Sequence, residues 1–288
     1  MSRRTIALMV LVAVGLGLLL YPGASNWFAE RVQSSELTGY AHAVAALPGP
    51  AQDQMLAEAE AYNARLAAGT TGASDATYGE YRSQLSPQPG DVMAELTVPS
   101  LRLTLPIYHG TSDDVLLRGV GHLFGTALPV GGVGTHAVLS AHSGLVTAEL
   151  FTHLENLKPG DFFSLDVVGR RLVYAVDHIA RIHPDDDSQL QPDPTQDYVT
   201  LLTCTPTGVN SHRLLVRGHR VMPVEQEQED QVIAGRRVDP GFPWWAVEWA
   251  GGVAVAAAVG VLLDRRRSRG LAASAAEQVP AMRGRHHA

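Results

Sequence analysis

Hydrophobic residues follow two different patterns along the chain. Two continuous apolar runs lie near the ends, at residues 5–21 and 244–263. Between residues 91 and 222 the apolar positions instead form short, often alternating runs that glycine and proline interrupt. A long continuous run is typical of a helix that spans a bilayer, whereas alternation with a period of two indicates strands. The pattern predicts a strand-rich domain between two membrane segments.

The flanks of the two apolar runs refine this prediction. Arg3 and Arg4 precede the first run, which at ~1.5 Å per residue is slightly short for a bilayer core of ~30 Å. It is therefore either an uncleaved anchor or a signal-peptide core. The second run begins with "WWAVEW", as an aromatic belt would, and "DRRRSR" follows it. A buried Ala/Val helix is the alternative for this second run. The arginines predict that both termini are cytoplasmic and the intervening chain is outside.

The segment before the strands has a helical pattern. Residues 26–70 are rich in Ala, Leu and Glu, with Leu56, Ala59 and Tyr62 at helical spacing. Residues 70–90 contain Gly, Ser, Thr and Pro with little apolar periodicity, which predicts a loop. After the strands, residues 223–243 carry "EQEQED", which is typical of a solvated acidic linker.

The central segment reads as many short strands and few helices. "DFFSLDVVGRRLVYAVDHIARIHP" predicts two strands joined by a turn at 168–170. The other strand candidates are "AELTVPSLRLTLPIYHG", "THAVLSAH", "DYVTLLTC" and "RLLVRGHRVMP". A short helix is expected in the stretch "SGLVTAELFTHLENL". This pattern predicts a mainly β domain, either a small barrel or a sandwich.

Composition excludes several classes of function. The formal charge of −7 and the pI near 5.9 argue against nucleic acid as a partner, because phosphate binding needs a basic surface. The single cysteine excludes an intrachain disulfide. It also leaves no second thiolate for a metal, and no histidine pair has the spacing of helical metal ligands. We therefore predict neither a metal nor a cofactor.

The single cysteine is the main candidate for chemistry. Cys204 ends the run "DYVTLLTC", in the part of the chain predicted to lie outside the cytoplasm. A free thiol there is a liability unless its reactivity is used, although a lone cysteine is otherwise often a small buried hydrophobe. Arg213 begins the next predicted strand. If the loop between them folds back, a guanidinium lies beside the thiol, where it favours the thiolate and offers donors to an oxyanion.

A cysteine nucleophile also needs a proton acceptor and donor. Among the twelve histidines, His142 follows the apolar strand "AVLSA" and opens the turn "HSGL". A histidine where a strand enters a loop is well placed for a site at a barrel mouth. His136 begins the same strand and is more suited to capping or lining it. His212 precedes Arg213 and would point to the opposite face.

The motif "TLLTCTPTGVNSHRLLVRG" resembles the Thr-Leu-x-Thr-Cys…Arg signature of sortases, the membrane-bound cysteine transpeptidases of Gram-positive bacteria. "LPIYHGTSDDVLLRGVGHLFGTALPVGG", "THAVLSAHSGL" and "LFTHLENLKPGD" resemble class C, the pilin-polymerising branch. The resemblance covers about residues 75–222 and the two-anchor layout. It implies an eight-stranded barrel with Cys204 as nucleophile, His142 as general acid/base and Arg213 as the substrate-positioning and oxyanion group.

The resemblance also implies a substrate. Cys204 would cleave a Leu-Pro-x-Thr-Gly sorting signal between Thr and Gly, and a lysine of a second pilin subunit would resolve the thioacyl enzyme as an isopeptide bond. Class C enzymes commonly carry a lid with an Asp-Pro-aromatic motif over the cysteine. Here the corresponding stretch is "SDATYGEY", where Asp75 is present, Ala76 replaces the proline and Tyr78 is the nearest aromatic. We therefore expect a looser lid. The usual His-Arg-Gly is "HSG", so Ser143 removes a positive charge near His142.

Three alternatives to pilus assembly remain at this point. The first is a housekeeping-type sortase that attaches surface proteins to the cell wall, and the second is a membrane-tethered binding protein with an inert barrel. A protease that only hydrolyses its substrate is the third. The long segment before the barrel and the C-terminal span favour the pilin-polymerising role. The predicted organisation is an anchor or signal segment (1–25), a helical segment with the lid (26–90), the catalytic barrel (91–222), an acidic linker (223–243), a transmembrane helix (244–263) and a basic cytoplasmic tail (264–288).

Overall fold

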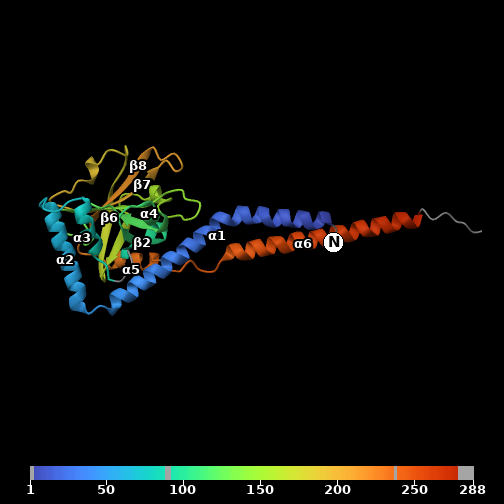
Figure 1. The fold of residues 1–288 in the computed structure, drawn as a ribbon, viewed down its shortest axis with the longest axis horizontal. Coiled ribbons are helices and arrows are strands. Elements are labelled where there is room, and N and C mark those ends of the chain that lie inside the picture. The colour runs from blue at the N-terminus through green and yellow to red at the C-terminus, as the bar shows by residue number, and fades with distance from the viewer. Residues whose placement is uncertain (1–2, 88–91, 237–238, 278–288) are drawn as a thin grey trace, which may run out of the picture. The chain divides into compact units, whose positions relative to one another are not determined.

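Eight strands form a closed barrel, which resolves the choice between barrel and sandwich. The computed structural model describes residues 3–87, 92–236 and 239–277, except for the side chains of residues 75, 227 and 270–277. The strands are β1 (Val92–Val98), β2 (Leu103–His109), β3 (Val120–His122), β4 (Thr135–Ser140), β5 (Phe162–Val167), β6 (Arg170–Ile182), β7 (Asp197–Thr205) and β8 (His212–Arg220). Their order around the barrel is β1-β2-β3-β4-β7-β8-β6-β5. Figure 1 shows the ribbon, with β2, β6, β7 and β8 among the labelled elements.

The pairing places β7 between β4 and β8, on the wall of the barrel opposite β1. β4 and β7 are parallel, whereas β7 and β8 are antiparallel. Val199 and Leu201 of β7 belong to the apolar core. Because side chains alternate along a strand, Leu202 and Cys204 point to the outer face. The active-site candidate therefore lies outside the barrel core, on an exposed strand end.

Most of the helical elements precede β1 or follow β8 in the sequence. They are α1 (Arg3–Ala46), α2 (Gly49–Ala67), α3 (Asp75–Ser83), α4 (Asp113–Arg118), α5 (Gln226–Gly235) and α6 (Trp244–Glu277), with single 3-10 turns η1 (Pro99–Leu101), η2 (Leu154–Asn156) and η3 (Ser188–Leu190). The helices predicted for 26–70 are confirmed as the second half of α1 and as α2. The short helix expected before "KPGD" is the turn η2.

The loop predicted for residues 70–90 is wrong for residues 75–83, which form α3. Ser74 begins the helix with a capping box, in which its hydroxyl and that of Thr77 satisfy backbone groups of the first turn. Tyr81, in the last part of α3, is fully buried in the core. A short polar helix of this kind gains its stability from a distant contact rather than from its own apolar period.

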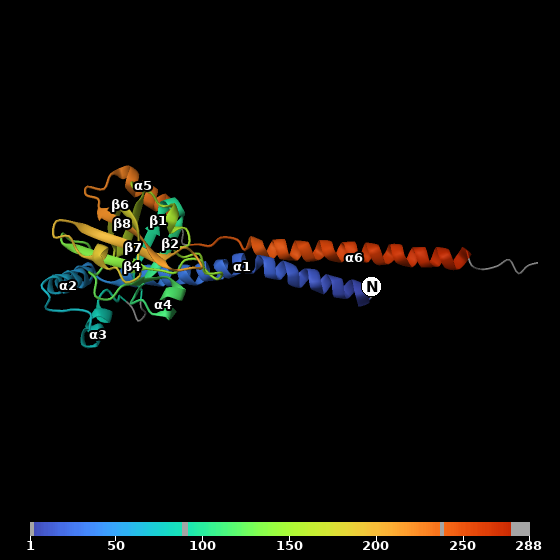
Figure 2. The same cartoon turned by 90° about the horizontal axis from the view of Figure 1, so that it is seen from above.

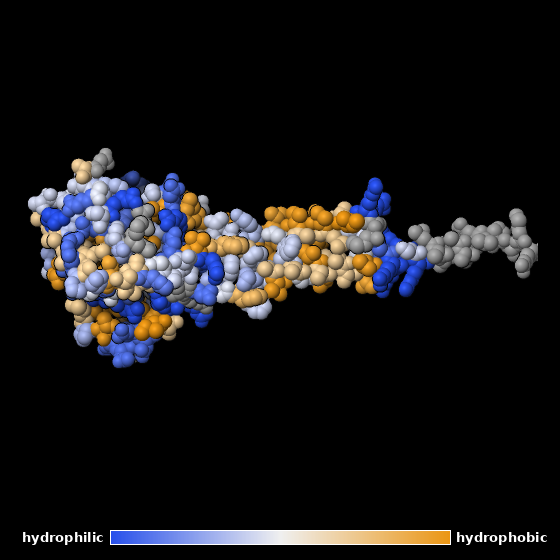
Figure 3. Space-filling model, turned by 60° about the horizontal axis from the view of Figure 1, so that its bottom comes forward, coloured by the Kyte–Doolittle hydropathy of each residue, from blue (hydrophilic) through white to orange (hydrophobic). Residues whose placement is uncertain are grey.

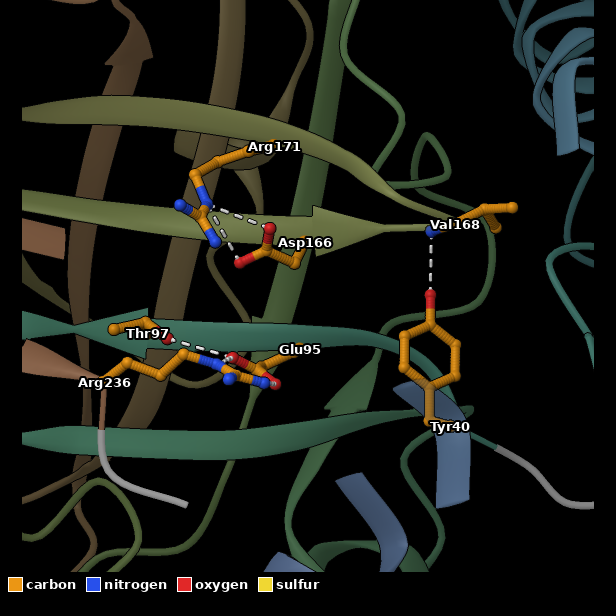
Figure 4. Close-up of polar contacts among 7 residues, drawn as sticks. All are labelled: Tyr40, Glu95, Thr97, Asp166, Val168, Arg171 and Arg236. Atoms are coloured by element: carbon orange, nitrogen blue, oxygen red, sulfur yellow. Dashed lines mark hydrogen bonds and ion pairs between the residues drawn. The ribbon is translucent and has the colours of Figure 1, made fainter. Parts of the chain in front are cut away.

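The chain divides into two compact units, residues 25–241 and residues 1–24 with 242–288. We call them the barrel unit and the terminal-helix unit. In the barrel unit, α1 packs against β1 and β2. Tyr40 of α1 donates a hydrogen bond to the carbonyl of Met93 (3.0 Å). It also accepts one from the amide of Val168 (2.8 Å), which is shown in Figure 4. Its ring joins a small apolar cluster with Val44, Val92, Tyr108 and Val115.

Residues 226–235 form a docked helix, which corrects the expectation of a fully solvated linker. α5 packs against η1, β1 and β5, and its Val232 is only 1% exposed. Figure 2 labels α5 and β1. Arg236, directly after α5, donates two hydrogen bonds of 2.5 and 2.8 Å to Glu95, which is 3% exposed. The acidic composition alone indicates a solvated segment, because Glu95 and the strands that dock α5 lie far from it in the sequence.

Glu95 faces a second carboxylate across the sheet (Figure 4). It pairs in register with Asp166 of β5, which receives a hydrogen bond of 2.9 Å from Arg171. Burial raises the pKa of Asp166 above its ordinary value, although the hydrogen bond from Arg171 opposes this shift. Two opposed carboxylates thus need two arginines, and one of them comes from the α5 segment. We call the surface of β1, β2 and β5 that contacts α1 and α5 the tether wall.

The terminal-helix unit pairs two apolar helices. The first part of α1 and residues 244–269 of α6 are long and apolar enough to cross a membrane. Thr5 donates a hydrogen bond to Asp264 (2.7 Å), and the Trp249 indole donates one to the carbonyl of Ala13 (3.0 Å). The apolar surface of this pair is bounded by hydrophilic residues at one end (Figure 3). Both predicted apolar helices are present.

Candidate active site

Cys204 lies in the penultimate position of β7 and is partly exposed. Its partner across the antiparallel pair is Arg213 of β8. Residues directly opposite each other in such a pair have Cβ atoms ~4.5–5.5 Å apart and share a face. The expectation that the loop folds back and brings the two side chains to neighbouring strand ends is confirmed. The partial exposure does not fit a cysteine that serves only as a small buried hydrophobe.

The guanidinium of Arg213 is held against the loop that joins β7 and β8. Its Nη1 donates long hydrogen bonds to the carbonyls of Asn210 (3.4 Å) and His212 (3.3 Å). Asn210 has a positive φ of 58°, which turns the loop sharply before β8. One nitrogen of the planar fork therefore rests on the loop backbone, beside the strand that carries Cys204.

His142 follows β4 and reaches the same end of the barrel. β4 runs parallel to β7 with Ser140 paired to Leu202, so His142 comes level with Cys204 two residues later. The ladder continues past the strand end, because the Ala141 amide donates to the Leu202 carbonyl (3.2 Å). His142 is partly exposed, and its carbonyl accepts a hydrogen bond from Phe151 (3.0 Å). The three residues predicted from the sequence thus meet at one end of neighbouring strands β4, β7 and β8.

This arrangement has counterparts among known proteins. The family model for the sortase domain matches residues 96–221. Among solved structures, a lid mutant of sortase A from Corynebacterium diphtheriae is 44% identical, with a TM-score of 0.59 over 64% of this chain and 100% of that one. The chain belongs to the sortase family. Sortase C1 from Streptococcus agalactiae is 38% identical, with a TM-score of 0.63 over 66% of this sortase and 100% of that chain.

Curated relatives of this sortase carry the names of different classes. Sortase SrtE1 of Streptomyces coelicolor is 34% identical over 154 residues, which is 49% of this chain and 43% of the relative. Sortase A of Bacillus anthracis is 30% identical over 130 residues, 45% of this chain and 60% of the relative. The chain therefore spans about half the length of these two relatives. The comparisons show the family, whereas the relatives' class names do not agree on one branch.

Two hydroxyl groups connect the His142 loop of this sortase to the Cys204 strand. Thr203 donates a hydrogen bond of 2.7 Å to the carbonyl of Ala141, and Ser143 donates one of 2.7 Å to the carbonyl of Cys204. The bonds run in opposite directions on either side of His142. The sequence interpretation treated Ser143 only as a lost positive charge and missed this contact, which depends on the parallel pairing of β4 and β7.

The residue after Ser143 on the His142 loop must be glycine. Gly144 has a positive φ of 73°, and a Cβ atom there would lie 2.1 Å from Cγ2 of Thr207. The His142 loop thus touches the loop that follows Cys204. The two hydroxyl bonds and this close approach fix the backbone on both sides of the candidate catalytic pair.

Replacing Ser143 with alanine tests this link. Loss of one hydrogen bond from a hydroxyl to a carbonyl costs about 1 kcal/mol of stabilisation. We therefore expect a several-fold fall in kcat with a smaller change in KM. The unfolding temperature should stay close to that of wild type. Ser143→Thr should recover most of the rate. Ser211→Ala is the matched control, since Ser211 is an exposed hydroxyl on the neighbouring β7–β8 loop. Equal rates for Ser143→Ala and wild type would remove any positioning role.

The two residues assigned to the lid are placed on α3. Asp75 begins the helix, and its side chain lies outside the described residues. Tyr78 is 37% exposed and packs its ring on Tyr81 and Phe124, at centroid distances of 5.7 and 5.0 Å. The contact of the Tyr78 ring with Phe124 thus joins α3 to the segment after β3. Closure of this stretch over Cys204 stays a prediction.

Tyr81 fixes α3 to the barrel through a buried polar cluster that the sequence interpretation did not find. Its hydroxyl bonds the carbonyl (3.0 Å) and Nδ1 (2.9 Å) of His122, and it accepts the amide of Gly110 (2.9 Å). Burial lowers the pKa of His122 to about 4, so this imidazole is neutral at physiological pH. Because that end of α3 is anchored, any lid movement is confined to the residues before Tyr81.

The two other histidines considered from the sequence, His136 and His212, form hydrogen bonds with neighbouring residues. His136 is buried, and its Nε2 accepts from the Thr200 hydroxyl (2.7 Å) while Nδ1 donates to the Gln191 carbonyl (3.1 Å). Burial lowers its pKa below the ordinary value. It therefore ties the β6–β7 connection to the outer face of β4, in agreement with a lining role. His212 is exposed and bonds Ser211.

Proposed function

We propose that this sortase is a cysteine transpeptidase with Cys204 as the nucleophile, His142 as the general acid/base and Arg213 as the oxyanion and substrate-positioning group. One observation carries the proposal: a partly exposed cysteine stands in register with an arginine and level with a histidine at one end of three adjacent strands. A thiol nucleophile, a proton carrier and a fixed cation are the parts that acyl transfer requires.

The reaction proceeds in two steps, formation of a thioester and transfer of the acyl group to an amine. The Cys204 thiol gives its proton to His142, and the sulfur attacks the threonine carbonyl carbon of the donor. The Thr–Gly amide bond breaks, and His142 passes that proton to the departing glycine amine. The resulting thioester is attacked by an acceptor amine, which gives a proton to His142 and displaces the thiolate. Arg213 stabilises the oxyanion of both tetrahedral intermediates. Its hydrogen bonds to the loop carbonyls hold one nitrogen of the fork on the loop that joins β7 and β8.

The donor we propose is a sorting signal of the Leu-Pro-x-Thr-Gly type. A similar protein, sortase C of Clostridium perfringens with the C-terminal cell wall sorting motif, is 42% identical, with a TM-score of 0.59 over 65% of this chain and 98% of that chain. The outer face of β4 and β7 next to Cys204 exposes Leu202 and Ser140 in part. At its far end a cavity of about 450 Å³ is lined by residues that include Phe124, His136 and Leu190. An extended apolar peptide fits such a face.

For the acceptor we propose a pilin lysine, which makes the enzyme a pilus-assembling, class C sortase. The long helical segment before the barrel, the lid stretch and the two apolar helices support this branch, as do the sortase C1 and sortase C structures among its neighbours. Anchoring to the cell wall is the second candidate, favoured by the neighbours and relatives named sortase A. The two differ in the acceptor: a folded pilin subunit with its lysine, or a cell-wall peptide amine.

We also propose that the enzyme is held in the cell membrane with the barrel unit outside. Two apolar helices of sufficient length lie near the ends of the chain. The arginines that flank them on their outer-sequence sides put both termini in the cytoplasm by the positive-inside rule, if the first segment is retained.

The proposed function is tested by trapping the intermediate. The protein is incubated with a Leu-Pro-x-Thr-Gly peptide, and its intact mass is measured before and after addition of a pilin subunit or a cell-wall peptide. We expect a mass increase that maps to Cys204 and is discharged by the pilin lysine. No adduct under any condition would support the inert binding protein, and discharge by water alone would support a protease. Discharge only by the cell-wall peptide would support the housekeeping role.

The lid is tested by the reactivity of the thiol. We expect an alkylating reagent to label Cys204 several-fold faster in the Asp75→Ala/Tyr78→Ala variant than in wild type, because removal of the Tyr78 ring loosens the stretch before Tyr81. Ser83→Ala, at the other end of α3, should label at the wild-type rate. Labelling is followed by mass spectrometry over time. Identical rates in the double variant and wild type would show that residues 70–85 do not guard the thiol.

A further inference from the structure

The two helices of the terminal-helix unit enclose a groove along their line of contact. It has a volume of about 410 Å³. Its apolar part is lined by Leu8, Met9, Val12, Ala256, Val259, Gly260 and Leu263. Leu8, Val12, Val259 and Leu263 are also exposed, so the groove opens sideways along the helix pair. Its walls are therefore suited to an apolar chain that lies parallel to the helices.

Close helix contacts give this groove its shape. A Cβ atom on Gly252 would lie 2.6 Å from Cδ1 of Leu16, and one on Gly260 would lie 2.7 Å from Cγ2 of Thr5. Small residues permit this approach of two helix backbones within a membrane. The hydrogen bond from Thr5 to Asp264 fixes one end of the pair. The groove lies on a contact that is pinned at defined points.

The pinned end of the groove is basic. Arg4, Arg266 and Arg267 line it together with one acid, Asp264. The lining therefore carries three positive charges and one negative charge. Arg3, Arg265 and Arg269 belong to the same two sequence segments but are not among the residues that line the groove. An apolar channel that ends in several arginines combines the two surfaces that a phospholipid presents, an acyl chain and a phosphate.

We propose that this groove is a binding site for an anionic phospholipid, with an acyl chain against Leu8, Val12 and Val259 and the phosphate at Arg4, Arg266 and Arg267. The net positive charge of the lining selects an anionic headgroup over a zwitterionic one. The proposal rests on the membrane insertion proposed above, and it is independent of the chemistry at Cys204. It assigns to the two anchors a lipid-binding role in addition to tethering.

The test compares two matched triple variants of the full-length protein. Arg4→Gln/Arg266→Gln/Arg267→Gln removes the groove arginines, and Arg3→Gln/Arg265→Gln/Arg269→Gln removes the same number from the same two segments. Each protein is incubated with mixed micelles of equal phosphatidylglycerol and phosphatidylcholine, and retained lipid is counted by native mass spectrometry. We expect wild type to prefer phosphatidylglycerol. Because each basic residue near an anionic lipid surface adds to the attraction, the groove triple should lose at least about tenfold of that preference and the control triple much less.

Two further measurements identify which part of the lipid the groove binds. Ala256→Leu narrows the groove without changing any charge, and it should reduce phosphatidylglycerol retention. Glycerol phosphate, which has the headgroup chemistry without acyl chains, should not displace the lipid at millimolar concentration. Equal loss in both triples would overturn the groove and leave only a general attraction of arginines to an anionic surface. Displacement by glycerol phosphate, or full retention by Ala256→Leu, would overturn the acyl-chain part.

Extraction of membranes with alkaline carbonate separates this proposal from the one it rests on. Wild type and both triple variants should stay in the membrane pellet. Release of the wild-type protein would overturn membrane insertion and the groove with it. If all three proteins stay in the membrane pellet and the two triple variants lose lipid equally, only the proposal of a groove site would be overturned.

Discussion

Cys204→Ala is expected to lose transpeptidation by at least ~10³-fold, because the change removes the nucleophile on which both steps depend. Stability should change little, since the side chain is partly exposed at a strand end and outside the barrel core. The measurements are the rate of peptide joining, the mass adduct and the thermal unfolding curve of the same preparation.

Cys204→Ser is the matched control, because it keeps a polar group of similar size that is a far weaker nucleophile near neutral pH. It should be nearly as inactive as the alanine variant. Substantial joining by Cys204→Ala with an unchanged product would assign the nucleophile elsewhere. A cooperative unfolding transition near that of wild type would exclude misfolding as the cause of inactivity.

Arg213→Lys is expected to lower kcat/KM by at least ~10²-fold, although the positive charge is retained. Lysine lacks the planar donor fork, and removal of one well-placed oxyanion donor costs a factor of this size. With a single nitrogen, lysine also cannot bind the Asn210 and His212 carbonyls and still leave further nitrogens to donate to the oxyanion. The rate of thioacyl formation from the peptide measures the effect on the first step directly.

Arg217→Lys provides the comparison on the same strand and the same outer face. Arg217 binds Asp177 with two hydrogen bonds and stacks on Tyr198, so its replacement perturbs the β8 surface without touching the proposed site. We expect it to keep most of the activity. If the two lysine variants were equally active, Arg213 would be only one charge among several on β8.

The barrel and the three site residues were predictable because their signals are local. Short apolar runs gave the strands, and the positions of Cys204, Arg213 and His142 at strand ends placed them at a common edge once the strands pair. The eight-stranded closure came from the family resemblance rather than from the pattern, which left a sandwich open. Pairing order is a long-range property that alternation along one strand does not encode.

The missed features all depend on contacts between distant segments. α3 is polar over most of its length and is anchored by Tyr81 on His122 and Gly110. α5 is acidic, and its docking depends on one buried valine and on Arg236 reaching Glu95. The Ser143 bond to the Cys204 carbonyl requires that β4 and β7 be parallel neighbours. In each case both residues are present in the sequence, but their contact cannot be recognised before the fold is known.

The position of the tether wall opposite β7 determines how mechanical tension would cross the enzyme. In the proposed thioacyl intermediate, a pilus pulled from outside would draw on Cys204 while α1 and α5 hold β1. Tension can pass around the barrel by two arcs. One runs through β3, which has only three residues and pairs with β4 at two positions. The other crosses the β1–β5 pair, which has three paired positions, and then runs through β5, β6 and β8, where the pairing is longer. The force would travel mainly through the β5–β6–β8 arc, and the weak seam at β3 beside the His142 strand would be the first place to open.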